Sequence, residues 1–88
     1  MLPNTIHPGE FLQTILEERS ISQSRLAAHI GVEPGVINLI CNGKRGISAV
    51  MAKKLARALG TDSELWMNLQ ISYDLTNADD PEFGKLRA

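Results

Sequence analysis

The chain has 88 residues, 43% of them hydrophobic, and a single cysteine. This length suits one domain and excludes two independent cores, while a single cysteine excludes an intrachain disulfide. The net charge of −1 is unlike the strongly basic balance of many DNA-binding domains.

The charges are unevenly distributed along the chain. Residues 19–57 carry seven cationic side chains against the single acid Glu33, whereas residues 1–18 and 58–88 both have more acids than bases. A basic middle between acidic ends indicates a polarised molecule, with one surface that attracts phosphate and others that repel it.

We expect a cytoplasmic protein that does not enter a membrane. The first ten residues lack the charged and apolar regions of a signal peptide, and no apolar run approaches the roughly 20 residues that span a bilayer. A lone cysteine also fits a reducing compartment.

The first two helices are predicted over about residues 8–19 and 23–30. Pro8 suits a first helical turn, and apolar residues recur at helical spacing through the first segment. Ser22 is a good N-cap for the second helix, and Gly31 suits the left-handed residue that ends it.

The third helix is predicted to begin near Pro34 and to stop at Asn42-Gly43. Its inner face contains three residues at helical spacing, Ile37, Ile40 and Cys41. We expect Cys41 to be a buried apolar thiol rather than a nucleophile or a metal ligand.

The fourth helix is predicted over Ala49–Leu59, with Ser48 as its N-cap, Gly60 beyond its end, and an inner face of Met51, Ala52, Leu55 and Leu59. Thr61 and Glu64 match a capping box for a fifth helix. The apolar residues expected on its buried face are Leu65, Leu69 and Tyr73, with Trp66 beside them.

These elements predict an all-α fold of five helices. We expect one helical domain over residues 1–76, followed by an acidic, flexible tail over residues 77–88. A core this small favours stabilisation by oligomerisation. No metal site is expected, because the two histidines and the cysteine lack the spacing of metal ligands. No cofactor or set of catalytic residues is expected either.

The stretch from Gln23 to Gly43 has the pattern of two short helices joined by a tight turn. Ala27 is small enough for the helices to approach closely, Gly31 tolerates the turn, and the branched residues at 37 and 40 hold the second helix. From spacing alone, two core-packed helices of any helical bundle remain an alternative.

Several motifs in this order resemble a known family. The pattern Gln23-x-x-x-Ala27-x-x-x-Gly31-Val32, followed by Ile37 and Asn42-Gly43-Lys44-Arg45, resembles the Xre-type (lambda-repressor-like) helix-turn-helix of phage repressors. Similarity to the HigA/VapI branch of antitoxins extends over about residues 6–76 and is carried by His7-Pro8-Gly9-Glu10, Lys44-Arg45-Gly46-Ile47-Ser48, the run from Lys54 to Thr61, and the run from Leu65 to Gln70.

The resemblance implies a cytoplasmic homodimer that represses its own operon at a palindromic operator. It also implies binding and neutralisation of a HigB-type toxin, a ribosome-dependent RNase. Two alternatives stay open: a free-standing Xre-type repressor without a toxin, and a helical protein-interaction adaptor that does not bind DNA.

The resemblance also implies roles for individual residues in binding DNA. Gln23, with Ser24 beside it, is expected to hold one phosphate, and a second phosphate is expected to meet the backbone amides and charge of Asn42, Gly43 and Lys44, assisted by Arg45. Phosphate contacts set affinity and register. The positions expected to face base edges are Pro34, Gly35, Asn38 and Leu39.

Asn38 is the only one of these base-facing side chains well suited to reading a base, most naturally adenine. Pro34 and Gly35 offer no side-chain hydrogen bond, and Leu39 can only contact a thymine methyl. We therefore predict thin direct readout, with DNA shape supplying much of the specificity.

Two further surfaces are predicted. The fifth helix is expected to form the dimer interface through Leu65, Trp66, Leu69 and Tyr73, and the acidic ends of the chain suit a basic toxin as well as they suit solubility. The cations Lys53, Lys54 and Arg57 fit either a solvated helix face or an outer part of the DNA footprint.

Overall fold

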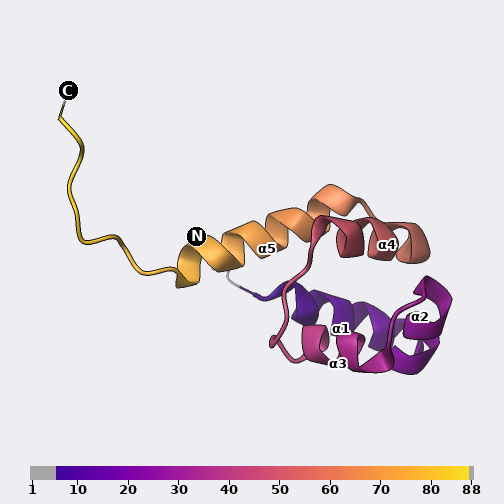
Figure 1. The fold of residues 1–88 in the computed structure, drawn as a ribbon. Coiled ribbons are helices and arrows are strands. Elements are labelled where there is room, and N and C mark those ends of the chain that lie inside the picture. The colour runs from indigo at the N-terminus through magenta and orange to yellow at the C-terminus, as the bar shows by residue number, and fades with distance from the viewer. Residues whose placement is uncertain (1–5, 88) are drawn as a thin grey trace.

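The computed structural model describes residues 6–87 and contains five helices, which confirms the predicted all-α fold (Figure 1). The helices are α1 (Pro8–Glu18), α2 (Gln23–Ile30), α3 (Pro34–Cys41), α4 (Ala49–Leu59) and α5 (Ser63–Asn77). Within the described range there is no strand. Residues 1–5 and 88 lie outside the described residues. The predicted domain begins and the predicted tail ends in these residues, and the first of the two ranges is half of the segment considered as a signal peptide.

The predicted caps of α2 and α4 are confirmed. The hydroxyls of Ser22 and Ser48 each accept a hydrogen bond from a backbone N–H in the first turn of their helix. At the other ends, Gly31 has a φ of 75° and Gly60 a φ of 74°, the left-handed geometry in which a side chain would be strained. The short connections between the helices follow from these stops.

The helices enclose one core. Helix α2 packs on α3 and α4, α1 packs on α3 and α5, and α4 packs on α5. The whole predicted inner face of α4 is buried. The hydrophobic residues of the core are Leu12, Ile15, Leu16, Leu26, Ala27, Ile37, Ile40, Ile47, Met51, Ala52, Leu55, Leu59 and Trp66.

The start of α5 differs from the prediction. Thr61 does not form the capping box expected with Glu64, because its hydroxyl accepts a hydrogen bond of 2.8 Å from the indole N–H of Trp66. The N-cap residue is Asp62. The indole ring lies inside the core with its centroid 5.2 Å from that of Phe11, so the need to pair a buried indole N–H decides the role of Thr61.

The buried face of α5 was predicted correctly for Trp66 but not for the other residues. Its buried residues are Trp66 and Gln70, whereas Leu69 and Tyr73 are half-buried and Leu65 is exposed. The helix is turned so that the large indole fills the core, which moves the predicted apolar stripe to the edge of the contact.

Helix α5 continues past the body of the molecule and leads into an extended segment over residues 78–87 (Figure 1). Every residue of this segment is exposed. None of the helices within residues 6–87 is long and apolar enough to cross a membrane.

Candidate nucleic-acid interface

Helix α3 packs on the core through one face and exposes the opposite face to solvent. Ile37 and Ile40 are both fully buried, as predicted for the residues that hold it. On the opposite face Pro34, Gly35, Asn38 and Leu39 are all exposed, and Leu39 keeps 41% of its surface. The structure thus brings all four predicted base-facing positions together on one exposed helix face.

Close contact with α1 sets the position of α3. Gly9 is buried at the start of α1, and a Cβ atom at this position would overlap the carbonyl oxygen of Ile40 in α3. Only glycine permits the two helices to approach this closely. The sequence pattern did not identify this requirement, because it depends on a contact between separate helices.

The loop after α3 corrects one expectation. The backbone amides of Asn42, Gly43 and Lys44 donate to carbonyl oxygens of α3, at distances of 3.0, 3.0 and 2.9 Å. These amides were expected to bind a phosphate, but they are already used to terminate the helix. The exposed side chains of Lys44 and Arg45 remain as the groups of this loop that suit a phosphate.

A chain of side-chain amides crosses the surface beside α3. Gln23, at the start of α2, is half-buried, and its Nε2 donates to Oε1 of Gln13 in α1 at 3.2 Å. Nδ2 of Asn38 donates to Oε1 of Gln23 at 3.2 Å, and Nδ2 of Asn42 donates to Oδ1 of Asn38 at 3.2 Å. Gln13 was missed in the sequence, because it is one of several polar residues in an amphipathic helix and its partner lies in α2.

These bonds leave Asn38 able to read a base. Its amide group has two N–H donors and two acceptor sites, and the two bonds use one of each. One donor and one acceptor remain, which is the pair that adenine requires in the major groove. Gln23 likewise keeps one N–H for a phosphate, and the neighbouring Ser24 is exposed.

Helix α5 supports the loop that carries Lys44 and Arg45. Oε1 of Gln70 accepts a hydrogen bond of 2.7 Å from the backbone N–H of Ile47, and the same oxygen would lie 3.0 Å from a Cβ atom placed on Gly46. Gln70 was not singled out in the sequence, because its partner is a backbone group in another part of the chain.

His7 contacts both the start of α1 and helix α5. Its Nδ1 accepts a hydrogen bond of 2.9 Å from the backbone N–H of Gly9, and its ring meets that of Tyr73 edge-on at 4.8 Å. Burial lowers the pKa of His7 from 6.5, against the opposing charges of Glu10 and Asp74. The neutral ring therefore caps α1 and links it to α5.

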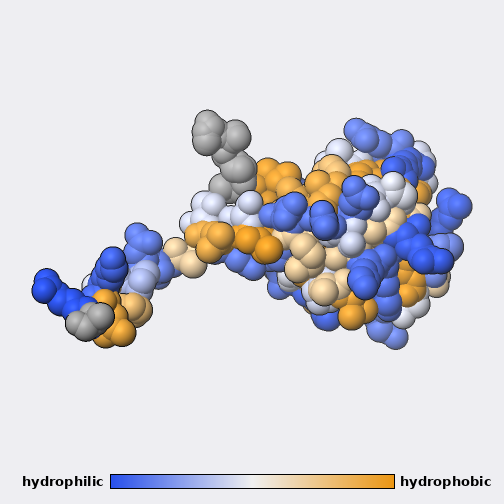
Figure 2. Space-filling view, turned by 90° about the horizontal axis from the view of Figure 1, so that it is seen from above, coloured by the Kyte–Doolittle hydropathy of each residue, from blue (hydrophilic) through white to orange (hydrophobic). Residues whose placement is uncertain are grey.

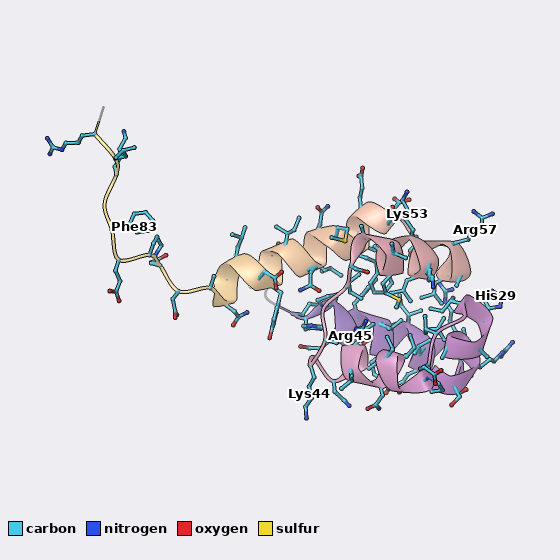
Figure 3. All side chains as sticks on the ribbon, in the orientation of Figure 1. His29, Lys44, Arg45, Lys53, Arg57 and Phe83 are labelled. Carbon is cyan, nitrogen blue, oxygen red and sulfur yellow. The ribbon has the colours of Figure 1, made fainter. Side chains whose placement is uncertain are left out.

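Two cations of α4 lie away from the loop of Lys44. Lys53 and Arg57 project from α4 on the side of the body opposite Lys44, so they do not extend the surface formed by α3 (Figure 3). This separation favours the interpretation as a solvated helix face. His29 is exposed on α2.

Cys41 is half-buried rather than fully buried as predicted. Burial raises the pKa of its thiol, which keeps it neutral and a poor nucleophile. Among the residues that the structure describes, no group of three histidine, cysteine or carboxylate side chains is placed to hold a metal ion.

The candidate dimer residues of α5 are placed differently from the prediction. Trp66 is completely buried within its own chain, so it has no surface to offer a second copy. Ile71 and Leu75, which were not predicted, are 51% and 73% exposed, compared with 37% for Leu65. Figure 2 shows hydrophobic atoms on the narrow part of the molecule between the body and the C-terminal tail. Ile71 and Leu75 are four residues apart, and this helical spacing was the sign in the sequence that they share one face of α5.

Comparisons with known proteins agree with this architecture. The helix-turn-helix family model matches residues 12–66. Virulence-associated protein I of Dichelobacter nodosus is 41% identical over 75 residues, which cover 84% of this chain and 69% of the relative.

Two solved structures extend the similarity to the fold. Antitoxin HigA of Pseudomonas aeruginosa, solved with the higBA promoter, is 44% identical, with a TM-score of 0.79 over 82% of this chain and 79% of its own. A HigA-family addiction module antidote protein from Coxiella burnetii is 39% identical, with a TM-score of 0.74 over 81% of this chain and 78% of its own. The chain therefore belongs to the helix-turn-helix family, in the branch of the VapI and HigA antitoxins, which are regulatory proteins and not enzymes.

Proposed function

We propose that this protein is a cytoplasmic antitoxin that binds the operator of its own operon as a dimer and represses it. The observation that carries the proposal is the exposed face of α3, where Asn38 stands between Gln23 and the cationic loop of Lys44 and Arg45. A base-reading group flanked by groups that suit phosphates is the arrangement that a helix in the major groove needs. A relative of similar fold, HigA of Pseudomonas aeruginosa, was solved with promoter DNA, which supports DNA binding by this chain.

Direct readout by this helix rests on one amide and on apolar contacts. Asn38 suits adenine, Leu39 suits a thymine methyl, and Pro34 and Gly35 bring no hydrogen-bonding side chain to the groove. Because few base edges are read, the sequence-dependent shape of the operator supplies much of the specificity.

Dimerisation follows from the operator. A palindromic site is bound by two copies related by a two-fold axis, one on each half-site. We place the dimer interface, called the seam below, on the outer part of α5. Ile71 and Leu75 expose more surface there than Leu65 does. Leu69 and Tyr73 are half-buried and remain candidates for the interface.

Neutralisation of a HigB-type RNase is the second half of the proposal, and the relatives described as an antitoxin and an antidote protein support it. An RNase that binds the ribosome needs a basic surface, and this chain is acidic over residues 1–18 and 58–88. These acidic segments do not include the basic loop of Lys44 and Arg45, which is left for DNA in this proposal.

A reporter gene placed under the DNA upstream of this protein's own gene tests repression. We expect the wild type to silence the reporter and the double variant Lys44→Glu/Arg45→Glu to lose most of that silencing, because two phosphate contacts become repulsive. The matched control is Lys53→Glu/Arg57→Glu, which makes the same charge change on α4. Equal silencing by both double variants would show that the loop of Lys44 and Arg45 does not contact the operator, and a wild type that does not silence the reporter would support an adaptor that does not bind DNA.

Co-expression tests the toxin. The protein encoded by the neighbouring gene should arrest growth when expressed alone, and this chain should relieve the arrest and co-purify with it. A neighbouring protein that is harmless, or whose toxicity this chain does not change, would leave a free-standing repressor.

A further inference from the structure

Four hydrogen bonds join five side chains into one line across α1, α2 and α3. Nε2 of Gln13 donates to Oε2 of Glu17 at 2.8 Å, and this bond continues the amide chain described above. The order from donor to acceptor is Asn42, Asn38, Gln23, Gln13 and Glu17. Every bond therefore has the same direction, with each N–H pointing toward Glu17.

A line made only of amides has no preferred direction. Each Asn or Gln can turn by 180° and exchange its oxygen for its nitrogen, so the same side chains form an equally good line with every bond reversed. The direction is decided by a member that can only accept or only donate. A carboxylate only accepts, and Glu17 at the end of the line is such a group.

We infer that Glu17 fixes the orientation of the Asn38 side-chain amide through Gln13 and Gln23, and so determines which base edge Asn38 matches. The carboxylate requires the NH₂ group of Gln13, which leaves the Gln13 oxygen facing Gln23. The Gln23 oxygen then faces Asn38, whose nitrogen turns toward α2 and whose oxygen turns toward Asn42.

The consequence is a defined pattern on the surface of α3. The free donor of Asn38 lies on the Gln23 side and its free acceptor on the Asn42 side, so one orientation of an adenine pairs with both. Turning the amide exchanges the two positions and mismatches that base. Glu17 and Gln13 are thus positioning residues for base recognition, which rests on the proposed operator binding by α3.

The bond to Glu17 is the shortest of the four and is assisted by charge. It also joins residues four apart on one helix, so little conformational freedom is lost in forming it. Its bias passes along the line because each amide must satisfy both neighbours at once, and each bond polarises the next.

Replacing the acceptor by a donor tests this inference. In Glu17→Lys the ammonium only donates, so Gln13 must turn its oxygen toward it and the whole line reverses. Glu18→Lys is the matched control, because it makes the same charge change at the neighbouring exposed position of α1. Both variants change the net charge equally, so a difference between them in the protein without DNA reports orientation.

A second substitution should restore the direction. In Gln13→Glu/Glu17→Lys the new carboxylate at position 13 accepts from Lys at 17 and from Gln23, as the Gln13 oxygen does in the wild type. Asn38 should return to its original orientation although the lysine is still present. Loss of a merely structural contact would not be rescued in this way.

Two measurements read the result. The side-chain amide resonances of Asn38 in the free protein should move in Glu17→Lys, stay in place in Glu18→Lys, and return in the double variant. The ratio of affinities for operator and scrambled DNA should fall about fivefold in Glu17→Lys, stay within about twofold in Glu18→Lys, and recover in the double variant.

Resonances of Asn38 that do not respond to Glu17→Lys, or that respond equally to Glu18→Lys, would overturn the inference. Because the resonance measurement uses no DNA, its result does not depend on the proposed function. If the resonances behave as expected while the wild type binds operator and scrambled DNA equally, the positioning line is upheld and the proposed operator recognition fails.

Discussion

Oε1 of Gln70 in α5 accepts a hydrogen bond of 2.7 Å from the backbone N–H of Ile47, which follows the loop of Lys44 and Arg45. The bond is buried, and Nε2 of the same side chain donates to Asp74 at 2.9 Å. The helix proposed to form the dimer seam therefore also holds the loop proposed to bind phosphate, so the two functions share one support.

Replacing Gln70 by leucine should destabilise the fold. The change leaves the buried N–H of Ile47 without a partner, and we expect the free energy of unfolding to fall by about 1–3 kcal/mol. Chemical denaturation measures this. The control is Asn68→Leu, an exposed amide on the same helix, which should change stability by less than about 0.5 kcal/mol. A Gln70→Leu protein as stable as the wild type would show that the bond contributes nothing.

Two glycine-to-alanine variants should have opposite effects. Gly9→Ala places a Cβ atom against the Ile40 carbonyl, so α1 must move away from α3, and we expect a loss of at least about 2 kcal/mol in unfolding free energy. Gly35→Ala meets no atom within 4 Å and lies within α3, so it should stabilise the protein by about 0.5–1 kcal/mol. Thermal and chemical unfolding of the pair measure the difference, and similar effects at both positions would contradict the close α1–α3 contact.

The stability of the fold should depend on the protonation of His7. Burial lowers its pKa in the folded state, and its Nδ1 must be unprotonated to accept from Gly9. The unfolded chain therefore binds the proton more readily, so this contribution is fully present above about pH 6.5 and is lost as the pH falls through the folded pKa.

Unfolding free energies of the wild type and His7→Asn, measured from pH 7.5 down to pH 5, test this dependence. Asparagine keeps an acceptor for the cap and does not titrate. The wild type should lose stability with acidification more steeply than the variant, by at most about 1.4 kcal/mol per pH unit. Parallel pH dependences would mean that His7 does not contribute.

Charging the outer end of α5 should separate the proposed dimer. Leu75 is 73% exposed in the single chain, so Leu75→Glu should leave the fold intact while placing two carboxylates at a two-fold seam. Sedimentation should show a monomer, and operator affinity should fall because the two half-sites are then bound independently. If Leu65→Glu separates the dimer and Leu75→Glu does not, the seam lies on the originally predicted stripe instead.

The fold was largely predictable because its boundaries are encoded locally. Ser22, Gly31, Ser48 and Gly60 act through their own backbone geometry or through neighbours within a turn, so the sequence alone places them correctly. The apolar face of α4 followed from helical spacing for the same reason. Local rules were sufficient wherever the partner lies nearby in the chain.

The prediction was wrong where the deciding partner lies elsewhere. Thr61 looked like a helix cap, but the buried indole of Trp66 takes its hydroxyl. The amides of Asn42 to Lys44 looked available to a phosphate, but the end of α3 uses them. Exposure of the four candidate base-facing residues on α3 followed from helical spacing, whereas the supporting residues Gln13 and Gln70 depend on contacts between helices.

The most direct test of operator recognition is a titration of the protein onto labelled DNA from upstream of its own gene, followed by fluorescence anisotropy at several salt concentrations. Wild type should bind this DNA far more tightly than a scrambled sequence, with affinity that falls steeply with salt. Lys44→Ala should weaken binding to both sequences and lower the salt slope by about 0.9, whereas Lys53→Ala should change neither. Equal, weak binding of the wild type to both sequences would contradict the account and leave the helical body as a surface for protein partners.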